Sequence, residues 1–130
     1  LLDGDLTVRD LPGAWNDTLH QLLAIRPTDD NDGCMQDIHW YGGDFGYFPT
    51  YTLGALAAAQ LFAAACAQLP SIFSAIASGN FTSLRNWLSE HVYEKGSLLD
   101  TQALLRGATG RNLGVDAFKR HLYKRYLDTV

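Results

Sequence analysis

The sequence predicts an all-α protein, and three observations support that prediction. Apolar residues recur at the three- and four-residue spacing of a helix in several separate segments. No segment alternates apolar and polar residues as a half-buried strand would. Hydrophobic residues make up 47% of the 130 residues and charged residues 18%, which excludes a disordered chain. We therefore expect a bundle of five to six helices in one domain, residues 1–130, with no internal domain boundary.

The first expected helix covers residues 11–24. Pro12 falls in its first turn, where the missing amide proton is not needed, and Trp15, Leu19 and Leu22 lie on one helical face. Residues 27–33, rich in Asp and Asn, then predict a surface loop.

The second expected helix covers residues 51–69 and contains eight alanines. At roughly 28 Å it has the length of a membrane span. Against a span, the segment contains Gln60 and Gln68, lacks flanking Lys or Arg, and ends at Pro70. We interpret it as the central helix of a soluble bundle, where small side chains let neighbouring helices approach closely.

Three further helices are expected in the second half of the chain. One begins at Phe81 and ends near Gly96, and a shorter one begins after Asp100 as N-cap and ends between Gly107 and Gly110. The last contains residues 115–126, with apolar residues on one face and four cations on the others.

Charge and cysteine content exclude several classes of protein. The formal net charge of −4 argues against a nucleic-acid binder and against a polybasic module on a membrane surface. Cys34 and Cys66 lie far apart with no histidine at ligand spacing, so we expect no disulfide framework and no zinc knuckle. No secretory signal is visible, which favours a cytoplasmic location. Because Leu1 cannot be a natural start, we expect the chain to be a piece of a longer protein.

Residues 33–51 have neither a helical nor a strand period, and they combine glycines, aromatic residues and polar groups. Glycine lets the backbone approach a ligand or adopt positive φ, and tyrosine offers an apolar ring with one polar tip. This predicts a Gly/Tyr-rich active-site loop. The alternative is a turn whose aromatic side chains close the end of the bundle.

The same segment resembles a known family. Residues 33–40 read Gly-Cys-Met-Gln-Asp-Ile-His-Trp, and residues 46–54 read Gly-Tyr-Phe-Pro-Thr-Tyr-Thr-Leu-Gly. Further matching runs are Gly4 to Leu6, Asp10 to Pro12 with Trp15, Ala58 to Phe62, and Ala108 to Gly110. With these residues the sequence resembles the carboxypeptidase Taq family of zinc metallocarboxypeptidases, whose motif is Gly-x-x-Gln-Asp-x-His-Trp. The resemblance covers nearly the whole chain.

The resemblance implies an enzyme larger than this chain. In the family, a His-Glu-x-x-His helix and a downstream Glu hold zinc, and no such motif is present among the four histidines here. We therefore expect the C-terminal portion of a larger, mostly helical metallocarboxypeptidase. Its zinc ligands would lie in the missing N-terminal part of its own chain. By the same resemblance the parent forms a homodimer and acts on peptides, and the fragment alone is inactive.

The resemblance also assigns residue roles. Tyr51 is expected to donate its phenolic O–H to the oxyanion, as in the related oligopeptidases of the thimet type, and His39 to be a second polar ligand. Tyr47 and Phe48 are candidates for lining the substrate cleft. Gln36 and Asp37 are expected to fix the loop, with the carboxylate setting the tautomer of His39; neither is a metal ligand.

Each role has a structural alternative. His39 could be a buried histidine bonded to Asp37 or to a backbone carbonyl, Tyr51 an ordinary core aromatic residue, and Tyr47 with Phe48 only packing. Glu90 and His91 are expected at a solvated helix edge, and Thr109 in a turn or cap. Tyr93 stands where many relatives have histidine, so its role is open. Since no arginine lies between residues 26 and 85, the group that binds the substrate carboxylate is expected upstream.

A second hypothesis is that the chain is a non-catalytic helical interaction or dimerisation module that has the same fold. It predicts a closed surface around residues 41–51 and a stable monomer. The fragment hypothesis predicts an exposed apolar face in the uncharged region 45–84.

Overall fold

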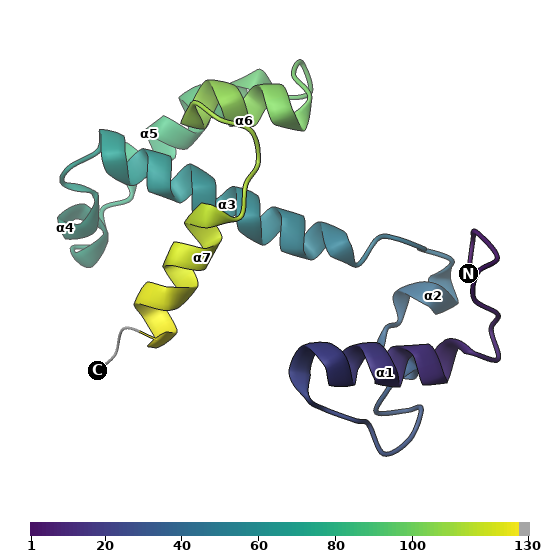
Figure 1. Cartoon of the computed structure of the whole chain (residues 1–130). Coiled ribbons are helices and arrows are strands. Elements are labelled where there is room, and N and C mark those ends of the chain that lie inside the picture. Colours follow the sequence, from purple (N-terminus) through teal and green to yellow (C-terminus); the bar gives the residue numbers. More distant parts are fainter. Residues whose placement is uncertain (128–130) are drawn as a thin grey trace. The chain divides into compact units, whose positions relative to one another are not determined.

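The computed structural model describes residues 1–127, apart from the side chain of Tyr41. Within that range all regular elements are helical, and six α-helices have at least six residues, which confirms the all-α prediction (Figure 1). Contacts divide the chain into two compact units, Leu1–Phe48 and Pro49–Val130. Units of contact are not by themselves independently folding domains, so the absence of an internal domain boundary stays a prediction.

The Leu1–Phe48 unit contains two α-helices. Helix α1, Leu11–Leu23, has a proline in its first turn and ends at Ala24, whose left-handed φ of 57° lets its N–H bond the carbonyl of His20. A 3₁₀ helix, Cys34–Gln36, precedes the one-turn helix α2, His39–Gly42. Among the described side chains of this unit, only one hydrophobic residue, Cys34, is buried.

The Pro49–Val130 unit is built around α3, with α6 and α7 packed against it (Figure 1). Its described elements are α3 Pro49–Gln68, α4 Ile72–Ala77, α5 Thr82–His91, a 3₁₀ helix Tyr93–Lys95, α6 Thr101–Thr109, α7 Asp116–Leu122 and a π-helical turn Tyr123–Leu127. Within the described residues, α3 alone is long and apolar enough to cross a membrane, judged by length and composition only.

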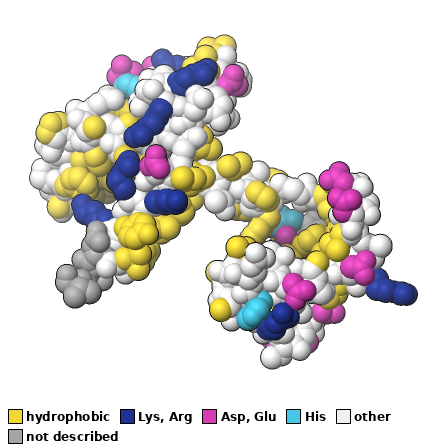
Figure 2. All heavy atoms as spheres, viewed as in Figure 1, with side chains coloured by type: hydrophobic (Ala, Val, Ile, Leu, Met, Phe, Trp, Pro, Cys, Tyr) yellow, Lys and Arg dark blue, Asp and Glu magenta, His cyan; other side chains and the backbone are white. Residues whose placement is uncertain are grey.

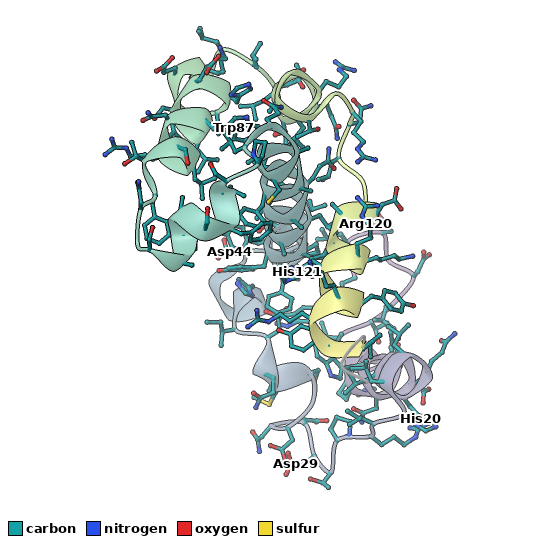
Figure 3. The ribbon with its side chains drawn as sticks, turned by 90° about the vertical axis from the view of Figure 1, so that its left-hand side faces the viewer. His20, Asp29, Asp44, Trp87, Arg120 and His121 are labelled. Carbon is teal, nitrogen blue, oxygen red and sulfur yellow. The ribbon has the colours of Figure 1, made fainter. Side chains whose placement is uncertain are left out.

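The core of this unit lies where α3, α4, α5 and α6 meet. Ala65, Ile72, Trp87 and Ala108 form it. Figure 3 shows Trp87 pointing from α5 toward α3. There its indole N–H donates a 2.8 Å hydrogen bond to Gln68, so a large side chain is buried without leaving a polar group unpaired.

A buried glutamine links α3 to the connection between α6 and α7. Gln60 is 3% exposed, and its amide nitrogen donates to the hydroxyl of Thr109 at 2.8 Å and to the carbonyls of Arg111 and Asn112 at 3.2 and 3.0 Å. Its amide oxygen accepts from the N–H of Gly114 at 3.0 Å. One side chain thus satisfies four backbone or hydroxyl groups of residues 109–114.

The predicted ends of α6 are confirmed. Asp100 is the N-cap, and its carboxylate accepts a 2.8 Å hydrogen bond from the N–H of Ala103. Gly110 follows the helix with φ of 79°, a left-handed conformation that glycine adopts without strain. Thr109 lies in the last turn and donates to the carbonyl of Leu105 at 2.7 Å.

Two α-helices, α2 and α4, were not predicted. Helix α2 lies within residues 33–51, where no helical period is visible, and α4 follows Pro70. Four and six residues are too few to show a period, and both short helices depend on contacts with the rest of their unit. Helix α3 begins at Pro49 rather than Tyr51, because proline fits the first helical position. The π-helical turn after α7 has no signal in the sequence that we can name.

Candidate active-site residues around His39

His39 and Asp37 form a tightly bonded pair at the start of α2. One carboxylate oxygen of Asp37 accepts from the backbone N–H of His39 at 2.9 Å and lies 2.6 Å from its ring Nδ1. The two side chains are only 14% and 15% exposed. A carboxylate accepts only, so Nδ1 carries the proton, which leaves Nε2 as the acceptor in the neutral imidazole. The contact through which Asp37 is predicted to set the tautomer of His39 is therefore present.

The pair also shifts the acidity of Asp37. Burial by itself raises the pKa of the carboxyl, but the hydrogen bonds from the backbone N–H and ring of His39, and the charge attraction to that ring, outweigh it. The net pKa of Asp37 is lowered from its ordinary value. Asp37 is therefore ionised at neutral pH and can hold the imidazole in one orientation.

Two aromatic rings lie near the imidazole of His39. The ring centres of Tyr47 and Phe48 are 5.4 and 5.1 Å from that of His39. Both side chains are about half exposed, at 49% and 55%. Gly46, with φ of 75°, makes the bend that precedes them. The imidazole thus contacts a carboxylate and lies near two rings that also face solvent.

Trp40 fixes α2 on α1. Its ring centre lies 5.9 Å from that of Trp15 in α1 and 6.4 Å from that of Phe45. Neighbouring residues of a helix point about 100° apart, so a tryptophan that packs on α1 directs the adjacent His39 toward a different side. Both indole nitrogens are buried without an acceptor among the described residues.

The first residues of the motif build the loop before α2. A Cβ on Gly33 would lie 3.1 Å from the carbonyl of Asp29 and 3.3 Å from the side chain of Asn16, so a larger residue there would push the loop away from α1. Gln36 donates from its amide to the carbonyl of Asn31. Gln36 therefore contacts the loop rather than His39.

The structure brings together some of the predicted residues. Asp37, His39, Tyr47 and Phe48 cluster in the Leu1–Phe48 unit. Tyr51 lies in the first turn of α3, in the other unit, with 61% of its surface exposed. Both the catalytic and the structural interpretation predict a hydrogen bond between His39 and Asp37, so this bond does not distinguish them. The roles of these residues stay predictions.

The residues present do not form a metal centre. Within the described part of the chain, no three His, Cys, Asp or Glu side chains gather closely enough to hold an ion. His91 stacks on Trp87 with ring centres 4.5 Å apart, and its Nδ1 lies 2.9 Å from the carbonyl of Trp87. His91 is thus half-buried and paired, not fully solvated. Tyr93 is 63% exposed in the following 3₁₀ helix.

A family model described as "Carboxypeptidase Taq (M32) metallopeptidase" matches residues 1–126. The chain belongs to this family. It is 40% identical over 126 residues to thermostable carboxypeptidase 1 of Thermus thermophilus and 36% identical over 126 residues to carboxypeptidase 1 of Bacillus subtilis. Each match covers 97% of this chain but 25% of the relative. The chain thus spans about a quarter of the length of these relatives.

Solved structures give the same result. The chain matches Trypanosoma cruzi metallocarboxypeptidase 1 with a TM-score of 0.91 and 38% identity, over 98% of this chain and 27% of that one. It matches the M32 carboxypeptidase of Deinococcus radiodurans with a TM-score of 0.90 and 39% identity, over 96% and 25%. Both similarities extend across the motif around His39.

Sequence reasoning missed two features. It matched Gln60 to the family as part of a run but gave it no role, although Gln60 joins α3 to residues 109–114. It also missed the contact between Trp15 and Trp40. An isolated glutamine in an alanine-rich helix is a signal for such a buried polar link, since an unpaired amide there would be costly.

Proposed function

We propose that this chain is the C-terminal part of a zinc-dependent carboxypeptidase that removes residues from the C-termini of peptides. It supplies groups that bind the substrate and transition state, while the metal ligands lie elsewhere in the parent polypeptide. Family membership supports the metallopeptidase class. The observation that supports a catalytic role for this part of the chain is the Asp37–His39 pair, whose imidazole lies near two half-exposed aromatic rings.

In this proposal Tyr51 stabilises the transition state. Attack on the scissile carbonyl places negative charge on its oxygen, and a phenolic O–H donates a hydrogen bond to that charge. Tyr51 lies in the first turn of α3 and is 61% exposed, so its position is compatible with contact to a substrate. His39 acts as a second polar ligand, and Asp37 keeps its ring in one tautomer and orientation.

Tyr47 and Phe48 are proposed to line the substrate cleft. Each packs one side of its ring near His39 while about half of its surface faces solvent. Such rings offer apolar surface to peptide side chains without a fixed charge, which suits a broad range of residues. The parent is proposed to be cytoplasmic and a homodimer, without a nucleic-acid or membrane partner.

The test is Tyr51→Phe in the full-length parent. We expect kcat to fall by about 10² to 10³, with KM changed much less, because the lost donor acts mainly in the transition state. Tyr126→Phe is the matched control: Tyr126 is equally exposed, at 61%, and should lose little activity. An unchanged kcat in Tyr51→Phe would remove Tyr51 from the mechanism.

The alternative is a non-catalytic interaction or dimerisation module. Many large apolar side chains are exposed, among them Leu22, Phe73 and Leu98, which suits a surface that binds another protein. Full carboxypeptidase activity in the parent together with the loss caused by Tyr51→Phe would exclude this alternative. Size-exclusion chromatography with light scattering would show whether the chain alone is a monomer.

A further inference from the structure

Helix α1 has an apolar side that its own unit covers only in part. It is amphipathic over 13 residues, yet none of its residues is buried. Its apolar side, with Leu6 from the preceding segment, forms an open groove of about 290 Å³ whose lining includes Leu11, Trp15, Leu19 and Leu22. A helix of this kind is normally stabilised by packing that apolar side against another element.

A second apolar hollow lies beside the groove and shares Leu11 with it. It has a volume of about 270 Å³, and its lining includes Val8, Met35, Trp40 and Phe45. The groove and the hollow together are called the α1 apolar surface below. With Cys34 as the one buried hydrophobic residue among its described side chains, the unit of 48 residues has almost no core of its own. Units this small are marginal even with a full core.

The unit that carries this surface is strongly acidic. Residues 1–48 contain nine Asp, no Glu and two Arg, a net formal charge of −7, whereas the whole chain has −4. Figure 2 shows Asp side chains, in magenta, on the visible face of this unit. Four of the nine Asp residues precede or lie within residues 6–22, which contain the lining of the groove: Asp3, Asp5, Asp10 and Asp17. A covering partner must therefore be apolar at its centre and cationic at its edge.

We propose that the α1 apolar surface is the docking site for an amphipathic helical segment with Lys or Arg at its rim, supplied by the part of the parent polypeptide that this chain does not include. The inference rests on the proposed function for the existence of that parent. The relatives are about four times as long as this chain, so the covering segment has a source. A second copy of the same surface is disfavoured because two units of −7 charge repel each other.

The experiment compares one substitution in two contexts. The first context is this 130-residue chain alone. The second is Bacillus subtilis carboxypeptidase 1 in which the matching quarter is replaced by this chain. Leu22→Asp places a charge in the groove at a residue that is 72% exposed here. Gln21→Asp is the matched control, because it adds the same charge one residue earlier on α1 and does not line the groove.

The expected result is a difference between the contexts. In the chimera, Leu22→Asp lowers the Tm by about 5 °C or more, because the charge becomes buried, while Gln21→Asp changes it by less than about 2 °C. In the chain alone both substitutions are nearly neutral, and Leu22→Asp reduces the binding of an apolar dye. Trimming of peptide C-termini by the unmodified chimera is measured separately, so an inactive chimera with the expected Tm difference refutes the proposed function but not this docking site.

Three results would overturn the inference. Equal Tm losses from Leu22→Asp in both contexts would show that the groove is already covered within this chain. Concentration-dependent oligomers of the chain that Leu22→Asp dissociates would make a second copy the occupant. A chimera that does not fold, while the unmodified Bacillus protein does, would show that this surface does not accept the covering segment.

Discussion

The two units of the chain differ in how much apolar side chain they bury. Among the described residues of the Pro49–Val130 unit, six hydrophobic ones are buried, namely Ala65, Ile72, Trp87, Leu105, Ala108 and Ala117. In the Leu1–Phe48 unit, Cys34 is the only buried hydrophobic residue among the described side chains. Yet the Leu1–Phe48 unit holds the His39 motif. The difference teaches that the Asp37–His39 pair lies in the unit with fewer buried hydrophobic residues, where local hydrogen bonds set its geometry.

The largest effect is expected from the core of the Pro49–Val130 unit. Trp87→Ala removes a 5% exposed ring and the hydrogen bond to Gln68, so it should destabilise this unit by about 3–5 kcal/mol. Trp15→Ala is the matched change in the other unit, where the ring lines an open groove. Urea unfolding followed by circular dichroism would measure both. Equal losses would mean that the contrast between the units is false.

The next largest loss of stability is expected when the hydrogen bonds of Gln60 inside the same unit are removed. Gln60→Ala leaves the hydroxyl of Thr109 and backbone groups of residues 111–114 without their partner, and should cost about 3 kcal/mol. Gln102→Ala is the control, because Gln102 is exposed and accepts one bond, from Leu113. Hydrogen exchange should show the loss of amide protection concentrated at the connection between α6 and α7. Comparable stability of the two variants would contradict the link.

What the sequence predicted follows the same division. The helices α1, α3 and α6 were placed within about two residues, because apolar spacing, alanine-rich composition and caps are local signals. The contacts of Gln60 and Trp40 were not predicted, since each joins segments far apart in the sequence. The His39 cluster was named from the family motif, and no periodicity alone would have shown which groups face the imidazole.

A smaller effect is expected at the start of α6. Asp100→Ala removes the side chain that accepts from the N–H of Ala103, and N-cap losses of this kind cost about 1 kcal/mol. Asp100→Asn keeps an acceptor and should recover most of the stability. Thermal unfolding of the two variants would measure this. A loss in Asp100→Asn as large as that in Asp100→Ala would show that charge, and not the cap, stabilises this end of the helix.

The smallest effect concerns the Asp37–His39 pair, and it depends on pH. The pKa of Asp37 is lowered in the folded chain by the hydrogen bonds from His39, although burial opposes them. Its stabilising contribution is therefore present above the pKa of the unfolded carboxyl, about 4, and is lost as the pH falls through the lower folded value. Asp37→Asn should abolish this acid-dependent loss of order around α2 while changing the Pro49–Val130 unit little. NMR titration of the His39 ring would follow it, with Asp44→Asn as an exposed control. If the wild type and Asp37→Asn lose the α2 turn over the same pH range, the carboxylate does not hold the imidazole, and the positioning role proposed for it fails.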